Sequence, residues 1–389
     1  MKRKIVIILM CLIVLFSQTP LAIKVYDNRN LSLYKNEVSA SVFKDYSTNI
    51  ANDTMSVKVL GITIKNINIK EDKKVYLGGQ TVGVAMYTNG LLVTDVIAIE
   101  DENGNFITPG KDAGIKKGDY LIKANNIKLD DVSNIDAILN NSKGEKIKLS
   151  ILRGNTTFET EINPVKSKKD GLFHLGLWMR DSAAGLGTIT YIDPETNRYM
   201  ALGHSICDSD TGQILSVRSG RVVECIITGV KKGEKGKAGE LKGTFGINAK
   251  QLGTVEDNTK FGILGNNAYL KKGELVTLGS QKSVETGKAY IYSDFENGEI
   301  KKYEIEIIHK NEQTYPSEKS MVIKITDKNL IEKTGGIVQG LSGSPIVQNG
   351  RLIGAVTHVM INDSTRGYGI FIENMIQISQ ENSQVKKAS

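Results

Sequence analysis

The sequence has few of the residues on which metal centres, disulfide frameworks and aromatic surfaces depend. Among its 389 residues are only 3 cysteines, 4 histidines and 1 tryptophan. Cys11 lies in an apolar run near the N-terminus, which leaves Cys207 and Cys225 for the rest of the chain. These two thiols either pair with each other or serve as small buried hydrophobic residues, and the sequence leaves both alternatives open. Because no second pair of ligands stands at a suitable spacing, we predict no metal site and no other cofactor.

Clustered positive charge is also missing, although the net charge is +7. The lysines are dispersed among acidic residues, and no basic stripe carries regularly interleaved aromatic residues, so the sequence argues against a nucleic acid partner. An apolar content of 40% and a charged content of 24% are typical of a globular protein, and the length allows two domains. With 39 glycines but only 9 phenylalanines, the chain is predicted to be rich in strands and turns.

The one long apolar run lies near the N-terminus. The basic residues Lys2–Lys4 precede the unbroken run Ile5–Phe16, and this order is typical of an export signal. The run is shorter than the roughly 20 residues of a membrane-spanning helix. Counting through Ile23 brings it into range, and no A-x-A-like cleavage site follows. We predict that residues 1–23 direct export, either as a cleaved signal or as a membrane anchor, and that the polar residues 24–70 form a spacer.

Residues 71–165 carry the pattern of a separate module. The run A-G-I-x-x-G-D starts at Ala113, and an amphipathic helix is predicted over Ser133–Asn141. This segment resembles bacterial PDZ domains, which implies that an extended peptide adds as a strand beside Val82–Tyr87 and against the helix. The peptide-binding residues implied in this way are Gly79, Val82, Gly83 and Val84. A purely structural β-rich spacer is the alternative interpretation.

The last region, residues 171–389, contains the strongest catalytic pattern. Gly340–Pro345 has the form G-x-S-G-x-P, which chymotrypsin-like serine proteases carry around their nucleophile. Its glycines let the backbone turn tightly and approach a substrate carbonyl. The N–H groups of Gly340 and Ser342 are predicted to form an oxyanion hole, while the Ser342 hydroxyl attacks the scissile carbon. The alternative is a glycine-rich turn between buried strands.

The spacing of strand-like runs in this region predicts a barrel or sandwich. Eight or more short runs are separated by glycines, and helical periodicity is scarce before Ile372. The predicted fold class is therefore mainly β. It comprises an N-terminal signal or anchor helix, a PDZ domain over 71–165 and a chymotrypsin-like β-barrel peptidase domain over 171–389.

A serine nucleophile needs a base, and His204 is the best candidate among the four histidines. It sits in a Gly-His turn after an apolar approach, which presents an imidazole at the end of a strand. His309 lies in an alternating strand and is expected at the surface, and His174 flanks the charged joint between the two domains. His358 follows the hairpin of the Ser342 loop, where a supporting or buried role fits better than catalysis.

The third member of a triad should be a carboxylate that orients the imidazole and stabilises the imidazolium. Asp327 ends a strand-like run just before the nucleophile segment, and it gives the chain order His, Asp, Ser. It equally suits a cap on the following turn. The competing carboxylates are Asp193, Asp208 and Asp363.

Taken together, these segments resemble the SpoIVB peptidase family. The likeness rests on the signal-like start, the PDZ pattern, the run around His204, and the long block Thr326–Ile346. It implies a serine endopeptidase of endospore formation with His204, Asp327 and Ser342 as its triad. It also implies export from the forespore into the space between the two spore membranes. There the enzyme would cleave a membrane-associated regulator, so that a membrane-embedded protease processes a mother-cell sigma factor precursor.

Two other functions compete with this interpretation. An HtrA-like quality-control protease is disfavoured because its PDZ domain follows the catalytic domain, whereas here it precedes it. A PDZ adaptor with a dead protease fold is disfavoured by the intact His204, Asp327 and Ser342. The PDZ ligand, whether substrate, partner or the chain's own tail, is left open.

Overall fold

The computed structural model describes residues 32–34, 37, 47–51, 54–59, 62–296, 298–311, 313 and 315–388. The predicted signal or anchor at residues 1–23 lies outside these residues. Within the described part of the chain, no helix is both long enough and apolar enough to cross a membrane.

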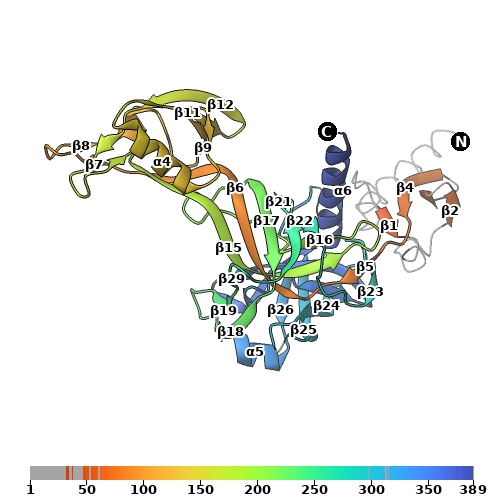
Figure 1. The fold of residues 1–389 in the computed structure, drawn as a ribbon. Coiled ribbons are helices and arrows are strands. Elements are labelled where there is room, and N and C mark those ends of the chain that lie inside the picture. The colour runs from red at the N-terminus through yellow and green to blue at the C-terminus, as the bar shows by residue number, and fades with distance from the viewer. Residues whose placement is uncertain are drawn as a thin grey trace, which may run out of the picture.

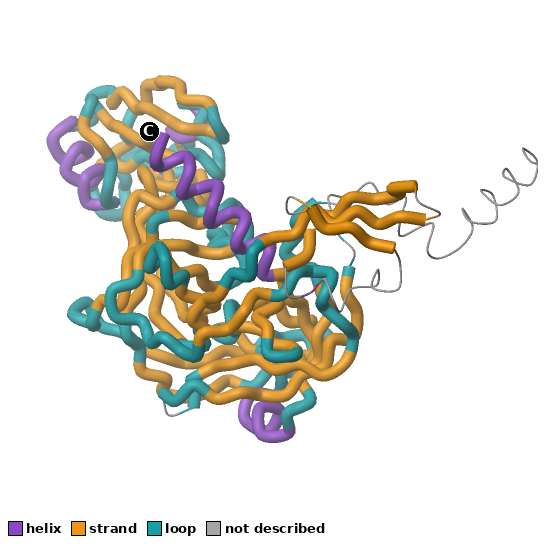
Figure 2. Tube along the Cα trace, turned by 90° about the vertical axis from the view of Figure 1, so that its right-hand side faces the viewer, coloured by secondary structure: helices purple, strands orange, loops and turns teal. Residues whose placement is uncertain are grey.

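Strands dominate the structure, which confirms the prediction of a mainly β fold (Figures 1 and 2). The N-terminal strands are β1 (Ser32–Tyr34), β2 (Ser47–Ala51), β3 (Thr54–Val59) and β4 (Ile62–Lys70). They form a separate four-stranded sheet in the order β1-β4-β3-β2, where the sequence predicted a polar spacer. Tyr34 of this region is buried against the peptidase barrel, and Glu37 accepts a hydrogen bond from the Ser280 N–H.

Two long strands connect the PDZ lobe to the peptidase barrel. They are β6 (Thr81–Val96) and β15 (Leu177–Ile192), which pair antiparallel along most of their length (Figure 1). The PDZ elements between them are β7 (Ile99–Glu100), β8 (Phe106–Ile107), α3 (Pro109–Asp112), β9 (Tyr120–Ala124), β10 (Ile127–Lys128), α4 (Val132–Ser142), β11 (Ile147–Arg153), β12 (Thr156–Ile162), β13 (Val165–Lys166) and β14 (Phe173–His174).

The barrel elements come from both sides of the PDZ lobe. They are β5 (Lys74–Leu77), β16 (Arg198–Ala201), β17 (Val217–Val223), β20 (Gln251–Val255), β21 (Asp257–Thr259), β22 (Gly262–Asn266), β23 (Leu275–Leu278), β24 (Gly287–Ser293), β25 (Lys301–Lys310), β26 (Met321–Ile325), β28 (Pro345–Gln348), β29 (Arg351–Met360) and β30 (Asp363–Phe371). A separate three-stranded sheet has the order β18-β19-β27 and consists of β18 (Ile226–Lys231), β19 (Gly239–Thr244) and β27 (Val338–Gln339). The helices of this region are α5 (Lys328–Thr334) and α6 (Ile372–Ala388).

The PDZ lobe is inserted into the barrel, which corrects the predicted succession of two domains. β5 pairs with β15 and β23, and the first half of β6 pairs with β15 and β17. Residues 74–87, predicted as the start of the PDZ domain, therefore belong to the peptidase barrel. The sequence pattern identified strands here, but it carried no information on their partners.

Four clusters of buried residues mark the lobes. One lies within the PDZ lobe and contains Ile135, Ile138 and Leu139, the buried residues of the amphipathic helix α4. Two clusters fill the barrel around β6, β15–β17 and β20–β22, and around β24–β26 and β28–β30. A further cluster packs α6 onto the barrel.

Candidate active site

The predicted nucleophile and base line one cleft of about 890 Å³. His204 follows β16, and Ser342 precedes β28, so the two side chains come from opposite barrel clusters. Gly340 and His358 line the same cleft, as do Ala183–Leu186 of β15 and Glu240–Thr244 of β19. The structure therefore brings together His204, Ser342 and Gly340.

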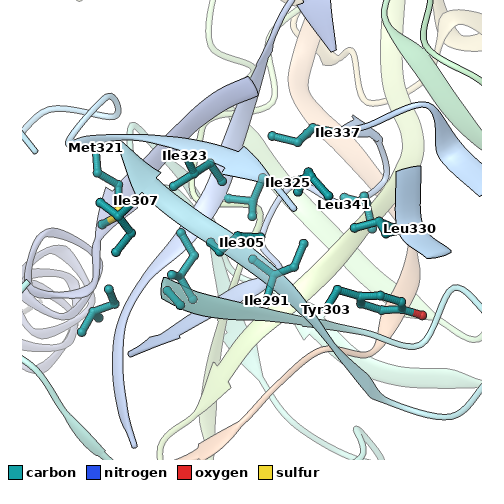
Figure 3. Packing of buried hydrophobic residues seen from close by; sticks show 14 of the residues in the cluster. Ile291, Tyr303, Ile305, Ile307, Met321, Ile323, Ile325, Leu330, Ile337 and Leu341 are labelled. Carbon is teal, nitrogen blue, oxygen red and sulfur yellow. The ribbon is translucent and has the colours of Figure 1, made fainter. Parts of the chain in front are cut away.

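The nucleophile loop is anchored by the side chain next to Ser342. Leu341 is fully buried and packs into the β24–β30 cluster, where Figure 3 shows it close to Leu330 and Ile337. Gly343 has a φ of 93°, and a Cβ atom there would lie 2.0 Å from the Thr188 carbonyl oxygen. Only glycine fits this crossing of the two loops.

The backbone of this loop is arranged for an oxyanion hole. The N–H groups of Gly340 and Ser342 donate to no acceptor among the described residues, whereas the N–H groups of Gly343 and Ser344 donate to Val356 and Leu341. Ser342 Oγ donates to the Thr357 carbonyl at 2.8 Å. Before Ser342 can attack a substrate, its hydroxyl must exchange the hydrogen bond to the Thr357 carbonyl for one to an imidazole nitrogen.

Thr188 of β15 joins the nucleophile loop to the histidine loop. Its N–H donates to the Ser342 carbonyl at 2.9 Å, and its carbonyl accepts from Leu202 N–H at 3.2 Å. Its hydroxyl donates to the Gly340 carbonyl at 2.7 Å. Thr190 donates in the same way to Gly343 at 2.8 Å. Both threonines are fully buried, so these bonds fix the direction of the loop's peptide groups.

His204 is held at a strained turn. Leu202 and Gly203, which precede it, have φ values of 72° and 70°. The imidazole Nδ1 lies 2.8 Å from the Ser205 carbonyl oxygen, so Nδ1 carries the proton and Nε2 is left as the acceptor. This is the tautomer that a general base for serine needs.

His358 is the second histidine of the site. Its ring centroid lies 4.9 Å from that of His204. Burial, followed by the neighbouring His204 and Lys319, lowers the pKa of His358 to about 4. A neutral His358 adds no positive charge beside His204, which fits the supporting role predicted for it.

The structure does not bring Asp327 to His204. Asp327 is the N-cap of α5, where its carboxylate accepts from Leu330 N–H at 2.9 Å and from Glu304 N–H at 3.4 Å. The competing carboxylates are engaged elsewhere, Asp193 with Lys73, Asp208 with Arg180 and Asp363 with Arg366. Among the described residues, no carboxylate lies within hydrogen-bond distance of His204.

The residues predicted to bind a peptide in the PDZ domain lie in the barrel instead. Gly83 and Val84 pair with β15 on one edge and with β17 on the other, and Val82 and Val84 are buried. The Gly79 N–H donates to the Ile189 carbonyl. A strand with both edges paired cannot accept a peptide, so this part of the prediction is wrong.

The free edge beside the PDZ helix belongs to β15. Its residues Leu177–Arg180 pair with β6 on one side only, and the carboxylate of the next residue, Asp181, accepts from Val132 N–H at the start of α4. The preceding turn, Leu175-Gly176, was not singled out from the sequence. The signal available was a glycine between two leucines directly before a strand-like run.

Cys207 and Cys225 are both free thiols. Cys207 lines the cleft near His204, whereas Cys225 lies by the Thr81 carbonyl, and burial raises its pKa to about 11. The alternative of a disulfide between them is therefore wrong.

Comparison with known proteins confirms the predicted PDZ domain and peptidase domain, although the PDZ match includes residues 74–87, which the structure pairs with barrel strands. A family model described as SpoIVB peptidase S55 matches residues 171–376, and a PDZ domain model matches residues 59–163. The chain is similar to a crystal structure of the Rv3671c protease in an inactive form, with 14% identity, a TM-score of 0.29 and coverage of 49% of this chain and 81% of that chain. A serine-to-alanine mutant of Rv3671c from M. tuberculosis H37Rv, also inactive, matches with 14% identity, a TM-score of 0.28 and coverage of 51% and 82%.

Proposed function

Because this chain belongs to the SpoIVB peptidase S55 family, we propose that it is a serine endopeptidase that acts as a signal between compartments during endospore formation. The chain is a PDZ-containing serine peptidase, which implies a protein substrate and a site for peptides. The observation that carries the catalytic proposal is the shared cleft of His204, Ser342 and the two free N–H groups of the nucleophile loop.

The proposed reaction is acyl transfer to Ser342. His204 Nε2 takes the hydroxyl proton as Ser342 attacks the scissile carbonyl, and the N–H groups of Gly340 and Ser342 bind the oxyanion. His204 then protonates the leaving amine. Water attacks the acyl-enzyme by the same sequence and releases the second product.

The orientation of the imidazole is proposed to rest on a backbone group. The Ser205 carbonyl holds the Nδ1 proton, which is the place of the carboxylate in a triad. A carbonyl fixes the tautomer as a carboxylate does, but it carries no full charge to stabilise the imidazolium. The family resemblance gives this role to Asp327, and the Asp327 variants described below separate the two assignments.

The proposed substrate is a membrane-associated regulator of a protease that processes a mother-cell sigma factor precursor. Cleavage would take place between the two forespore membranes, after export directed by residues 1–23. This part of the proposal is supported by the family membership and by the signal-like sequence.

A fluorophosphonate probe tests the catalytic proposal directly, because it reacts only with an activated serine. We expect the purified protein to be labelled at Ser342, Ser342→Ala to be unlabelled, and His204→Ala to lose labelling by at least roughly 10³-fold. Absence of labelling in a folded wild-type protein would favour the dead PDZ adaptor.

A further inference from the structure

Resting on the proposed function, we propose that one substrate segment occupies the PDZ groove and the active-site cleft together, by adding as a strand along the free edge of β15. β15 begins in the PDZ lobe and ends at the catalytic loops. Over Leu177–Gly187 it pairs with β6 on one edge, with a break in the register at Asp181, and no described strand pairs with the other edge. Unpaired edges of this kind accept extended peptides by main-chain hydrogen bonds.

The PDZ end of this edge has a place for a carboxylate. Leu175 and Gly176 are buried, and their N–H groups donate to no acceptor among the described residues. Buried N–H groups without partners are rare in folded proteins. Gly176 has a φ of 65°, and successive N–H groups at such a left-handed turn form a concave anion site. The free C-terminus of a peptide supplies the matching anion.

The other end of the edge reaches the nucleophile. Ala183–Leu186 line the cleft that contains His204 and Ser342. Two residues beyond them, the Thr188 N–H donates to the Ser342 carbonyl. The edge therefore runs without interruption by another strand from the proposed carboxylate site to the scissile position.

The direction of the substrate follows from the carboxylate site. Gly176 precedes β15, so a chain whose C-terminus is bound there must run antiparallel to β15 to reach the cleft. Upstream residues then lie opposite Leu177–Gly187, one for each residue of β15. At about 3.3 Å per residue, the edge spans about 33 Å, which places the cut about ten residues before the C-terminus.

This arrangement defines a substrate class rather than a sequence. Main-chain pairing tolerates many side chains, so the requirement is a free C-terminal tail of about ten extended residues. The surface along the free edge of β15 includes an apolar side chain, Trp178, which is 61% exposed on the PDZ half of the strand. Leu241 and Lys242 of β19 form the opposite wall at the cleft.

The experiment maps cleavage sites in two pools of random, unstructured peptides of about 25 residues, one with free C-termini and one with amidated C-termini. The full-length protein is used, and products are identified by mass spectrometry. We expect cleavage to cluster roughly 8–12 residues before a free C-terminus, and amidation to reduce kcat/KM at these sites at least about tenfold. If the cleavage sites were spread evenly along the peptides, or if amidation did not reduce cleavage at the cluster, the proposal would be overturned. The proposed peptidase activity would not be affected by either result. Failure to cleave either pool, with no fluorophosphonate labelling, would overturn both.

A pair of glycine variants tests the path within the protein. At Gly185, which lines the cleft, and at Gly229 in β18, a Cβ atom would meet open space, and neither residue has a positive φ. Gly185→Arg is expected to reduce the clustered cleavage at least about tenfold, and Gly229→Arg is the matched control with no change. Unchanged clustering in Gly185→Arg would show that the substrate does not follow β15.

Discussion

β6 and β15 lie side by side over most of their length, yet only β15 has an edge to offer a ligand. Over Gly83–Tyr87, β6 is paired on both edges, and its Val84 and Met86 side chains are buried in the barrel. The partner residues of β15 line the cleft with an edge that no described strand covers. Both strands look alike in sequence, as alternating small and apolar residues. A strand can bind an extended peptide only if its second edge is unpaired, and tertiary structure decides whether that edge is paired.

The largest expected effect is the difference in stability between two variants that each place an arginine at a glycine, one on β6 and one on β15. At Gly83 a Cβ atom would lie 2.4 Å from the Phe245 ring, whereas at Gly185 it would meet open space. We expect Gly83→Arg to destabilise the protein by about 4 kcal/mol or more, or to prevent folding. Gly185→Arg should change the free energy of unfolding by less than about 0.5 kcal/mol. Urea unfolding monitored by circular dichroism checks both, and a stable Gly83→Arg would reopen β6 as the groove.

The next effect concerns the inner end of β15, where Thr188 holds the Gly340 carbonyl. Thr188→Val keeps the shape but leaves this buried carbonyl without its donor, which costs about 1–3 kcal/mol. We expect kcat to fall roughly 10-fold to 100-fold with KM little changed, because oxyanion groups act in the transition state. Thr188→Ser should restore kcat. An equal loss in Thr188→Ser and Thr188→Val, in steady-state kinetics, would point to packing instead.

A pH effect is expected from His358 at the rim of the same cleft. Its folded-state pKa is lowered to about 4 from the usual 6.5, so its neutral form is favoured by folding. The corresponding stability is fully present above pH 6.5 and is lost as the pH falls towards 4. We expect the Tm of the wild type to decrease over this window more steeply than that of His358→Gln. Parallel pH profiles of Tm would contradict the buried neutral state.

The smallest effect is expected at Asp327, the N-cap of α5. Since asparagine also caps helices well, Asp327→Asn should retain most of its turnover, and Asp327→Ala should lose about 1 kcal/mol of stability. Peptide hydrolysis and urea unfolding measure the two. A severe loss of kcat in a fully stable Asp327→Asn would restore the predicted triad.

Local sequence patterns predicted a good part of the structure. The helix expected at Ser133–Asn141 is α4, and the hairpin expected after the Ser342 loop is β28–β29. The Ser342 loop and the His204 turn were found because glycines and a nucleophile leave a local signature. Strand partners between distant segments leave none, so the insertion of the PDZ lobe was missed. The sequence leaves the role of Asp327 open, because a carboxylate at the end of a strand and one that caps a helix look the same in sequence, and in the structure it caps α5.

The most direct test of the β15 account is hydrogen–deuterium exchange on full-length Ser342→Ala with an unstructured peptide of about 25 residues that carries a free C-terminus. We expect slower exchange in Leu175–Gly187 when the peptide is bound, no change in Thr81–Tyr87, and no effect of the same peptide when its C-terminus is amidated. Protection confined to β6, or no protection along β15 at peptide concentrations that saturate binding, would contradict the account.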